Sequence, residues 1–129
     1  MRFMMFMLPN LSPDEYVEPT AEAVTTMGKF NEELEKAGAL LDLNGLHSQA
    51  EGARVTHSGG KSTVIDGPFT EAKEVIGGYW IIQAKSQDEA IEWAKRVPSV
   101  QGDPFTIEIR QIQEIEDFPP EVQAKLRGA

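Results

Sequence analysis

The chain has 129 residues, enough for one hydrophobic core and too few for two comfortable domains, so a single domain over residues 1–129 is expected. It contains no cysteine, which excludes disulfides, thiolate metal sites and a cysteine nucleophile. Twenty-one acidic residues against twelve basic ones give a net charge of −9. Because no basic cluster offsets that charge, nucleic acid and anionic lipid are not expected as partners. No apolar run approaches the roughly 20 residues of a membrane span, and a cytoplasmic protein is expected.

The first third of the chain predicts a strand, a capped turn and a helix. Residues 3–8 are apolar at both parities, which is typical of a central strand covered on both faces. The run is too short, and lacks a small-residue cleavage site, to indicate a signal peptide. Ser12-Pro13-Asp14-Glu15 has the form of a capping box. A helix is predicted from about Thr20 to Ala37, with one apolar stripe and Gly38 closing it in the left-handed conformation.

The remaining elements follow from alternation, glycine turns and a second capping box. Each is bounded by turn or capping residues of its own. In chain order they are a strand at 40–47, a hairpin of 54–57 and 61–65 joined by Ser58-Gly59-Gly60, a strand at 79–84, a helix opened by Ser86-Gln87-Asp88-Glu89 and stopped by Pro98, a strand at 105–110, and a short helix at 121–126 within an acidic tail that covers about 114–129.

The order of elements indicates an α+β fold of the ferredoxin-like type. It consists of two split βαβ halves around an antiparallel sheet, with an inserted β-hairpin and both helices on one face. One helical layer cannot hide both faces of a sheet whose strands are apolar on both sides. Either a second copy of the chain covers the other face as a two-fold homodimer, or the hairpin or the tail folds back over it. The homodimer is the favoured interpretation.

The segment from Ile65 to Tyr79 carries the most specific pattern. Gly67 is expected to supply a backbone angle that other residues avoid, and Pro68 to fix the next one. Together they would hold Asp66 at a strand end, with Phe69 packed under the turn. Gly77-Gly78 would let the backbone approach another segment closely before the next strand.

This segment resembles the DGPF family, part of the larger YCII-related group. The residues that match the family pattern are Asp66, Gly67, Pro68, Phe69, Glu71, Lys73, Glu74, Gly77 and Gly78. The resemblance extends through most of the chain and implies a ferredoxin-like domain that forms a dimeric α+β barrel. It also implies an association of some members with extracytoplasmic-function sigma factors, so a sigma factor is a possible partner. Better-studied relatives use a His–Asp pair with the histidine near the first helix, and residues 20–37 contain no histidine.

Site candidates gather around this segment. Asp66 either acts as an acid or base beside Phe69 or only caps the turn. His47 either faces a cavity or is a polar residue at a strand end, and His57 is expected to be a solvated hairpin residue. Ligand-binding candidates are Phe69, Lys73, Glu74 and Tyr79. Tyr79, Trp80 and Trp93 either line an aromatic pocket or, for at least two of them, pack in the core. The two histidines lie in different segments without close ligand spacing, so no metal site and no cofactor are expected.

Three functions remain open at this stage. The first is a homodimeric domain that binds a small molecule in a cavity between sheet and helices near Asp66. The second is an enzyme that performs proton transfer or elimination on a small metabolite, with Asp66 and His47 as catalytic candidates. The third is an interaction module of sigma-factor-linked transcription. No serine–histidine–aspartate order, phosphate-cradling glycine loop or dinucleotide fingerprint decides between them.

Overall fold

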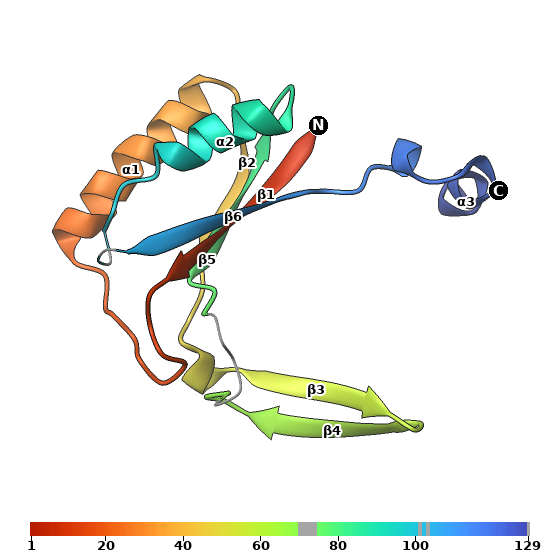
Figure 1. Ribbon diagram of the computed structural model, residues 1–129, viewed down its shortest axis with the longest axis horizontal. Helices are drawn as coiled ribbons and strands as arrows, with labels where there is room; N and C mark the ends of the chain where they lie inside the picture. The colour runs from red at the N-terminus through yellow and green to blue at the C-terminus, as the bar shows by residue number, and fades with distance from the viewer. Residues whose placement is uncertain (70–74, 101, 103, 129) are drawn as a thin grey trace.

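The computed structural model describes residues 1–69, 75–100, 102 and 104–128. A four-stranded antiparallel sheet in the order β2-β5-β1-β6 forms its centre. Helices α1 and α2 cover one face of this sheet (Figure 1), and the predicted ferredoxin-like α+β fold is confirmed. The elements of this layer are β1 (Arg2–Pro9), α1 (Ala21–Lys36), β2 (Leu40–Gly45), β5 (Gly78–Gln83), α2 (Gln87–Lys95) and β6 (Phe105–Gln111).

Both long helices begin at the residues that the sequence indicates. The Thr20 hydroxyl accepts a hydrogen bond from the amide of Ala23 at 3.0 Å. The Ser86 hydroxyl accepts from the amide of Glu89 at 3.2 Å. Each bond satisfies one amide that has no partner within its helix. Gly38 follows α1 with φ of 70°, the left-handed conformation that the sequence predicts for the helix end.

The segment around Ser12 forms the predicted turn, with part of the bonding of a capping box. The Glu15 side chain accepts from the amide of Ser12 at 2.8 Å, as a capping box requires. The amide of Glu15 donates to the Ser12 carbonyl at 3.0 Å, and the Ser12 hydroxyl is not its acceptor. Pro19, which lacks an amide, leaves too little chain for a helix before α1 begins. The Ser12 amide holds the pKa of Glu15 below its usual value.

The hydrophobic core lies between the sheet and the two helices. Phe3 and Met5 of β1, Ile82 of β5 and Leu34 of α1 are fully buried. Burying one such side chain contributes about 1.5–3 kcal/mol. Phe30 lies at the centre of an aromatic group, because its ring meets the rings of both Trp80 and Trp93 edge to face. Core packing is therefore confirmed for these two tryptophans.

No helix or strand among the described residues covers the opposite face of the sheet. Its centre consists of Met4 and Phe6 from β1 with Tyr79 and Ile81 from β5, which alternate with the core residues along each strand. We call these four residues the open face. All four are half-buried, and polar side chains of β2 and β6 flank them.

Two segments project away from the sheet on the side opposite the helices (Figure 1). One is the hairpin of β3 (Ala53–Ser58) and β4 (Lys61–Asp66), which we call the hairpin arm. The other, residues 112–128, is the tail arm, with the short helices η2 (Ile115–Asp117) and α3 (Pro120–Leu126). A further short helix, η1 (Gln49–Glu51), precedes the hairpin. Because both arms extend outward, the interpretation that either folds back over the open face is wrong.

The hairpin forms where the sequence predicts it, with a two-residue turn in place of the expected three-residue connection, because Ser58 pairs with Lys61 as part of β3. Gly59 and Gly60 have φ of 57° and 77°, which suits a two-residue turn with both central residues in the left-handed region.

No helix in the described part of the chain is long and apolar enough to cross a membrane.

Candidate functional site

A cavity of about 340 Å³ lies on the helix side of the sheet, between α1 and the strands β2 and β5. Its volume falls within the range of small-molecule sites. Apolar side chains and glycines make up most of its lining. The lining residues are Met7, Pro19, Ala23, Val24, Met27, Gly28, Asn31, Leu43, Asn44, Gly45, Gly77, Gly78, Tyr79, Trp80 and Val100.

A polar anchor stands in this apolar lining. The indole nitrogen of Trp80 donates to Oδ1 of Asn31 at 2.8 Å, which ties β5 to α1. The bond fixes the orientation of the Asn31 side chain, since Oδ1 must face the indole. The amide nitrogen of Asn31 is then the group that remains to donate to a ligand in the cavity. Sequence reasoning missed Asn31, because a single asparagine on a helix carries no distinctive signal.

Glycine shapes the cavity at two positions. Gly28 lies in the middle of α1, where glycine costs about 1 kcal/mol relative to alanine. A Cβ atom at Gly28 would meet nothing within 4 Å, so the space above it is open. At Gly78 a Cβ atom would come within 2.8 Å of the Asn44 carbonyl oxygen, which confirms the predicted close approach of the backbone. The mid-helix glycine was the signal in the sequence that could have indicated this site.

The Asp66-Gly67-Pro68-Phe69 segment lies at the root of the hairpin arm. Gly67 does not have a positive φ, so the expected reason for glycine is wrong. The actual reason is steric: a Cβ atom there would lie 1.8 Å from the carbonyl oxygen of Gln49. The Gly67 amide donates to the Gly52 carbonyl at 3.0 Å and closes the base of the hairpin. The peptide bond between Gly67 and Pro68 is cis.

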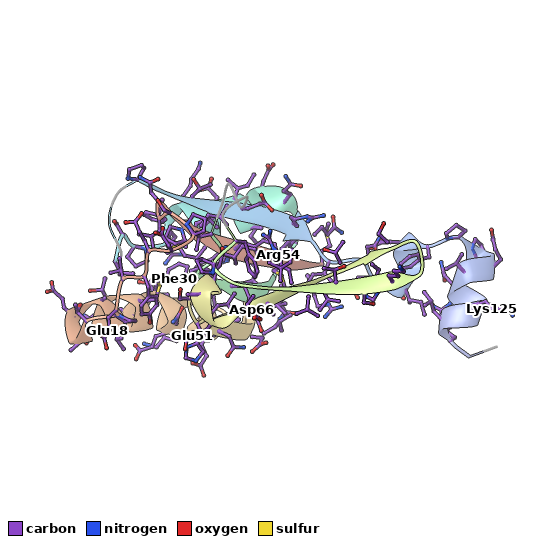
Figure 2. The ribbon with its side chains drawn as sticks, turned by 90° about the horizontal axis from the view of Figure 1, so that it is seen from below. Glu18, Phe30, Glu51, Arg54, Asp66 and Lys125 are labelled. Carbon is purple, nitrogen blue, oxygen red and sulfur yellow. The ribbon has the colours of Figure 1, made fainter. Side chains whose placement is uncertain are left out.

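Asp66 is exposed at the end of β4 and is not among the residues that line the cavity. Figure 2 shows Asp66 at the root of the hairpin arm. Phe69 is half-buried, with the guanidinium of Arg54 4.1 Å from its ring centroid. This contact is a cation–π interaction across the hairpin base. Lys73 and Glu74 lie outside the described residues.

The two histidines are both exposed. Nδ1 of His47 is 3.3 Å from a carboxylate oxygen of Glu51, and the His47 side chain is 88% exposed. Nδ1 of His57 is 3.0 Å from the Ser62 hydroxyl on the facing hairpin strand. Neither lines the cavity of α1, β2 and β5. The catalytic roles of Asp66 and His47 stay predictions.

Tyr79, a predicted ligand-binding residue, is among the residues that line the cavity, although its side chain lies on the open face of the sheet. Its hydroxyl accepts from the side-chain amide nitrogen of Asn44 at 2.9 Å and donates to the carboxylate of Asp42 at 3.2 Å. These partners lie on β2, on the open-face side of the sheet. Among the described lining residues Tyr79 is the only one with a titratable side chain, and that side chain lies on the other face of the sheet. The arrangement therefore suits binding of a neutral, largely apolar molecule.

Two comparisons with known proteins bear on the identity of the chain. The family model of the YCII-related domain matches residues 1–116. An uncharacterized protein of Rhizobium meliloti (strain 1021) is 32% identical over 77 residues, which is 60% of this chain. The match spans 62% of the length of that relative. Since the family model covers the whole sheet-and-helix layer as well as the hairpin arm, the chain belongs to the YCII-related family.

Proposed function

We propose that this chain binds a small, largely apolar molecule with one hydrogen-bond acceptor in the cavity between α1, β2 and β5. The amide nitrogen of Asn31 would donate to that acceptor, and Met27, Leu43 and Trp80 would contact the apolar body of the ligand. An apolar cavity with few fixed polar groups is typical of small-molecule sites.

The observation that carries the proposal is Gly28. An alanine or leucine there would favour the helix by up to about 1 kcal/mol, yet the chain has a glycine under an open space. A side chain at this position would project into the cavity. The glycine therefore keeps the cavity open at a cost in helix stability, which is expected where a ligand needs the volume.

Native mass spectrometry of protein purified from its own host tests the proposal. The wild type should retain a small molecule, and Gly28→Leu should lose it because the leucine side chain fills the cavity. Thr26→Leu is the matched control, since Thr26 is exposed on the same helix and is not among the lining residues. If Gly28→Leu and Thr26→Leu retain the same molecule to the same extent, the cavity is not its site.

The acid–base alternative receives less support from the same geometry. Asp66 and His47 are exposed and neither lines the cavity, so a substrate held there would not contact them. General acid–base catalysis requires hydrogen-bond reach between the side chain and the reacting group. Binding is therefore the function that the cavity supports best.

We further propose that two copies of the chain associate through the open face. Four large side chains, Met4, Phe6, Tyr79 and Ile81, form its centre, and no helix or strand in the described part of the chain covers them. A two-fold dimer is the commonest way to bury such a face. Light scattering should give twice the 14.3 kDa of one chain at micromolar protein, and a mass of one chain would overturn the dimer.

A further inference from the structure

The hairpin arm is a two-stranded sheet whose strands, among the described residues, pack chiefly on each other. Every residue of β3 and β4 is exposed. The exposed fraction reaches 55% for Val55 and 63% for Val64, which face each other across the strands. An isolated two-stranded hairpin is at best marginally stable in water and needs a packing partner. The exposed valine pair therefore indicates a surface that another molecule covers.

The tail arm is supported just as poorly. Its root is fixed by Arg2, whose guanidinium nitrogen Nε lies 2.6 Å from a carboxylate oxygen of Glu114. Beyond that point α3 packs chiefly against η2, and Leu126 is exposed. A helix of this length is not stable in water without packing. The tail arm, like the hairpin arm, therefore exposes apolar surface, in this case at Leu126.

The two arms carry charge of opposite sign. The hairpin arm contains two basic residues, Arg54 and Lys61, and one acidic residue, Asp66. The tail arm has four acidic residues and no basic residue within 114–121, followed by Lys125 and Arg127. In a chain of net charge −9 the hairpin arm thus carries a net positive charge, whereas the first half of the tail arm carries a net negative charge.

Both arms leave the sheet toward the open face and are separated from each other by a gap (Figure 1). A second copy docked on the open face would therefore contact both the hairpin arm and the tail arm. Two-fold symmetry allows two arrangements: each arm meets its own counterpart, or each hairpin arm meets the tail arm of the other copy. Pairing each arm with its own counterpart brings like charges together, whereas pairing hairpin arm with tail arm brings opposite charges together. Electrostatic complementarity therefore favours the pairing of hairpin arm with tail arm.

We propose that in the homodimer the hairpin arm of each protomer packs along the tail arm of its partner. The valine pair and the apolar residues of the tail arm would then share one intermolecular core, with basic residues of the hairpin arm near the acidic stretch 114–121. This inference rests on the homodimer proposed above. It goes beyond that dimer because the sheets could pair through the open face without any contact between the arms.

Site-specific cross-linking tests the pairing, and the cysteine-free chain makes it direct. Thr63→Cys places one thiol in the middle of the hairpin arm, and Glu121→Cys places one at the start of α3. Proteins with the two substitutions, one of them carrying a mass tag, are mixed, allowed to exchange subunits and treated with a short bismaleimide. Thr26→Cys on the outer side of α1 is the control, because that helix lies on the far side of the sheet from both arms.

The expected product is a cross-link between the Thr63→Cys and Glu121→Cys chains, several-fold more abundant than any product with the Thr26→Cys control. A dominant link between two Thr63→Cys chains would overturn the pairing in favour of the like-with-like arrangement. A dimer by light scattering without cross-links above the control would overturn the arm pairing alone. A monomer would overturn both the dimer and the pairing, so the two failures are distinguishable.

Discussion

The indole Nε1 of Trp80 donates to Oδ1 of Asn31 at 2.8 Å, and this bond joins the central sheet to α1 at the wall of the cavity. Trp80 is buried, while Asn31 is half-buried. An indole N–H that is out of reach of water needs its acceptor, because an unsatisfied buried donor carries a desolvation penalty. The same bond leaves the Asn31 amide nitrogen as the donor for the proposed ligand.

Asn31→Ala removes the acceptor of the Trp80 indole and should lower the free energy of unfolding by about 1–3 kcal/mol. Urea denaturation measures this loss. Asn31→Asp keeps an oxygen for the indole but replaces the amide donor, so it should lose less stability than Asn31→Ala and still release the ligand in native mass spectrometry. Equal unfolding free energies for wild type and Asn31→Ala would contradict the structural role of the bond.

Gly67→Ala should destabilise the base of the hairpin arm. The new Cβ atom would lie 1.8 Å from the Gln49 carbonyl oxygen, which forces the backbone apart. Overpacking of this kind costs roughly 1–3 kcal/mol. Amide hydrogen exchange should show faster exchange in β3 and β4, with little change in β1 and β5.

Gly52→Ala is the matched control for that change. Gly52 is the residue whose carbonyl accepts from the Gly67 amide, but a Cβ atom there would lie an ordinary 3.5 Å from the Gln49 carbonyl oxygen. Its effect should stay within about 0.5 kcal/mol. If the amides of β3 and β4 exchange at the same rate in Gly52→Ala and Gly67→Ala, the close approach to Gln49 is not the reason that position 67 needs glycine.

The elements of the fold could be predicted because their signals are local. Thr20 and Ser86 start helices through bonds within three residues, and Gly59 and Gly60 set the hairpin through their own backbone angles. Alternation of core and open-face residues along β1 then places each side chain on one face of the sheet. Such information is contained in short windows of sequence.

The site could not be predicted in the same way, since it depends on contacts between distant segments. Asn31 and Trp80 are 49 residues apart, and nothing near either one indicates the bond. Gly67 illustrates the limit well: its glycine was expected from local backbone geometry, and the cause is the carbonyl of Gln49, 18 positions earlier. The direction in which the two arms leave the sheet also depends on tertiary structure and could not be predicted from short segments of the sequence.

Ser86→Ala should lower the free energy of unfolding by about 1 kcal/mol, because the amide of Glu89 loses its capping acceptor at the start of α2. Ser86→Asp should retain most of the stability, since a carboxylate oxygen also accepts from that amide and is favourable at a helix N-terminus. Urea denaturation of the three proteins measures the difference. A loss as large for Ser86→Asp as for Ser86→Ala would contradict the capping role.

Glu15 should make a small contribution to stability that depends on pH. Its pKa is lowered in the folded protein, chiefly by the hydrogen bond from the Ser12 amide. A depressed pKa stabilises the folded state above the unfolded pKa, and the contribution disappears as the pH falls through the folded value. The stability difference between wild type and Glu15→Gln should therefore be largest near neutral pH and vanish in acid. A difference that grows on acidification would contradict this sign.

Ile81→Glu should separate the two copies of the proposed homodimer without unfolding either one. Ile81 lies on the open face beside Met4, so the substitution would bury a carboxylate of each protomer in an apolar contact. An unpaired charge buried at an interface typically costs several kcal/mol, and a weakening of the dimer of at least about tenfold is expected. Light scattering over a dilution series measures it. Thr26→Glu introduces the same charge on the exposed side of α1 and should leave the dimer intact. Equal masses for the two variants at every dilution would show that the open face is not where the copies meet.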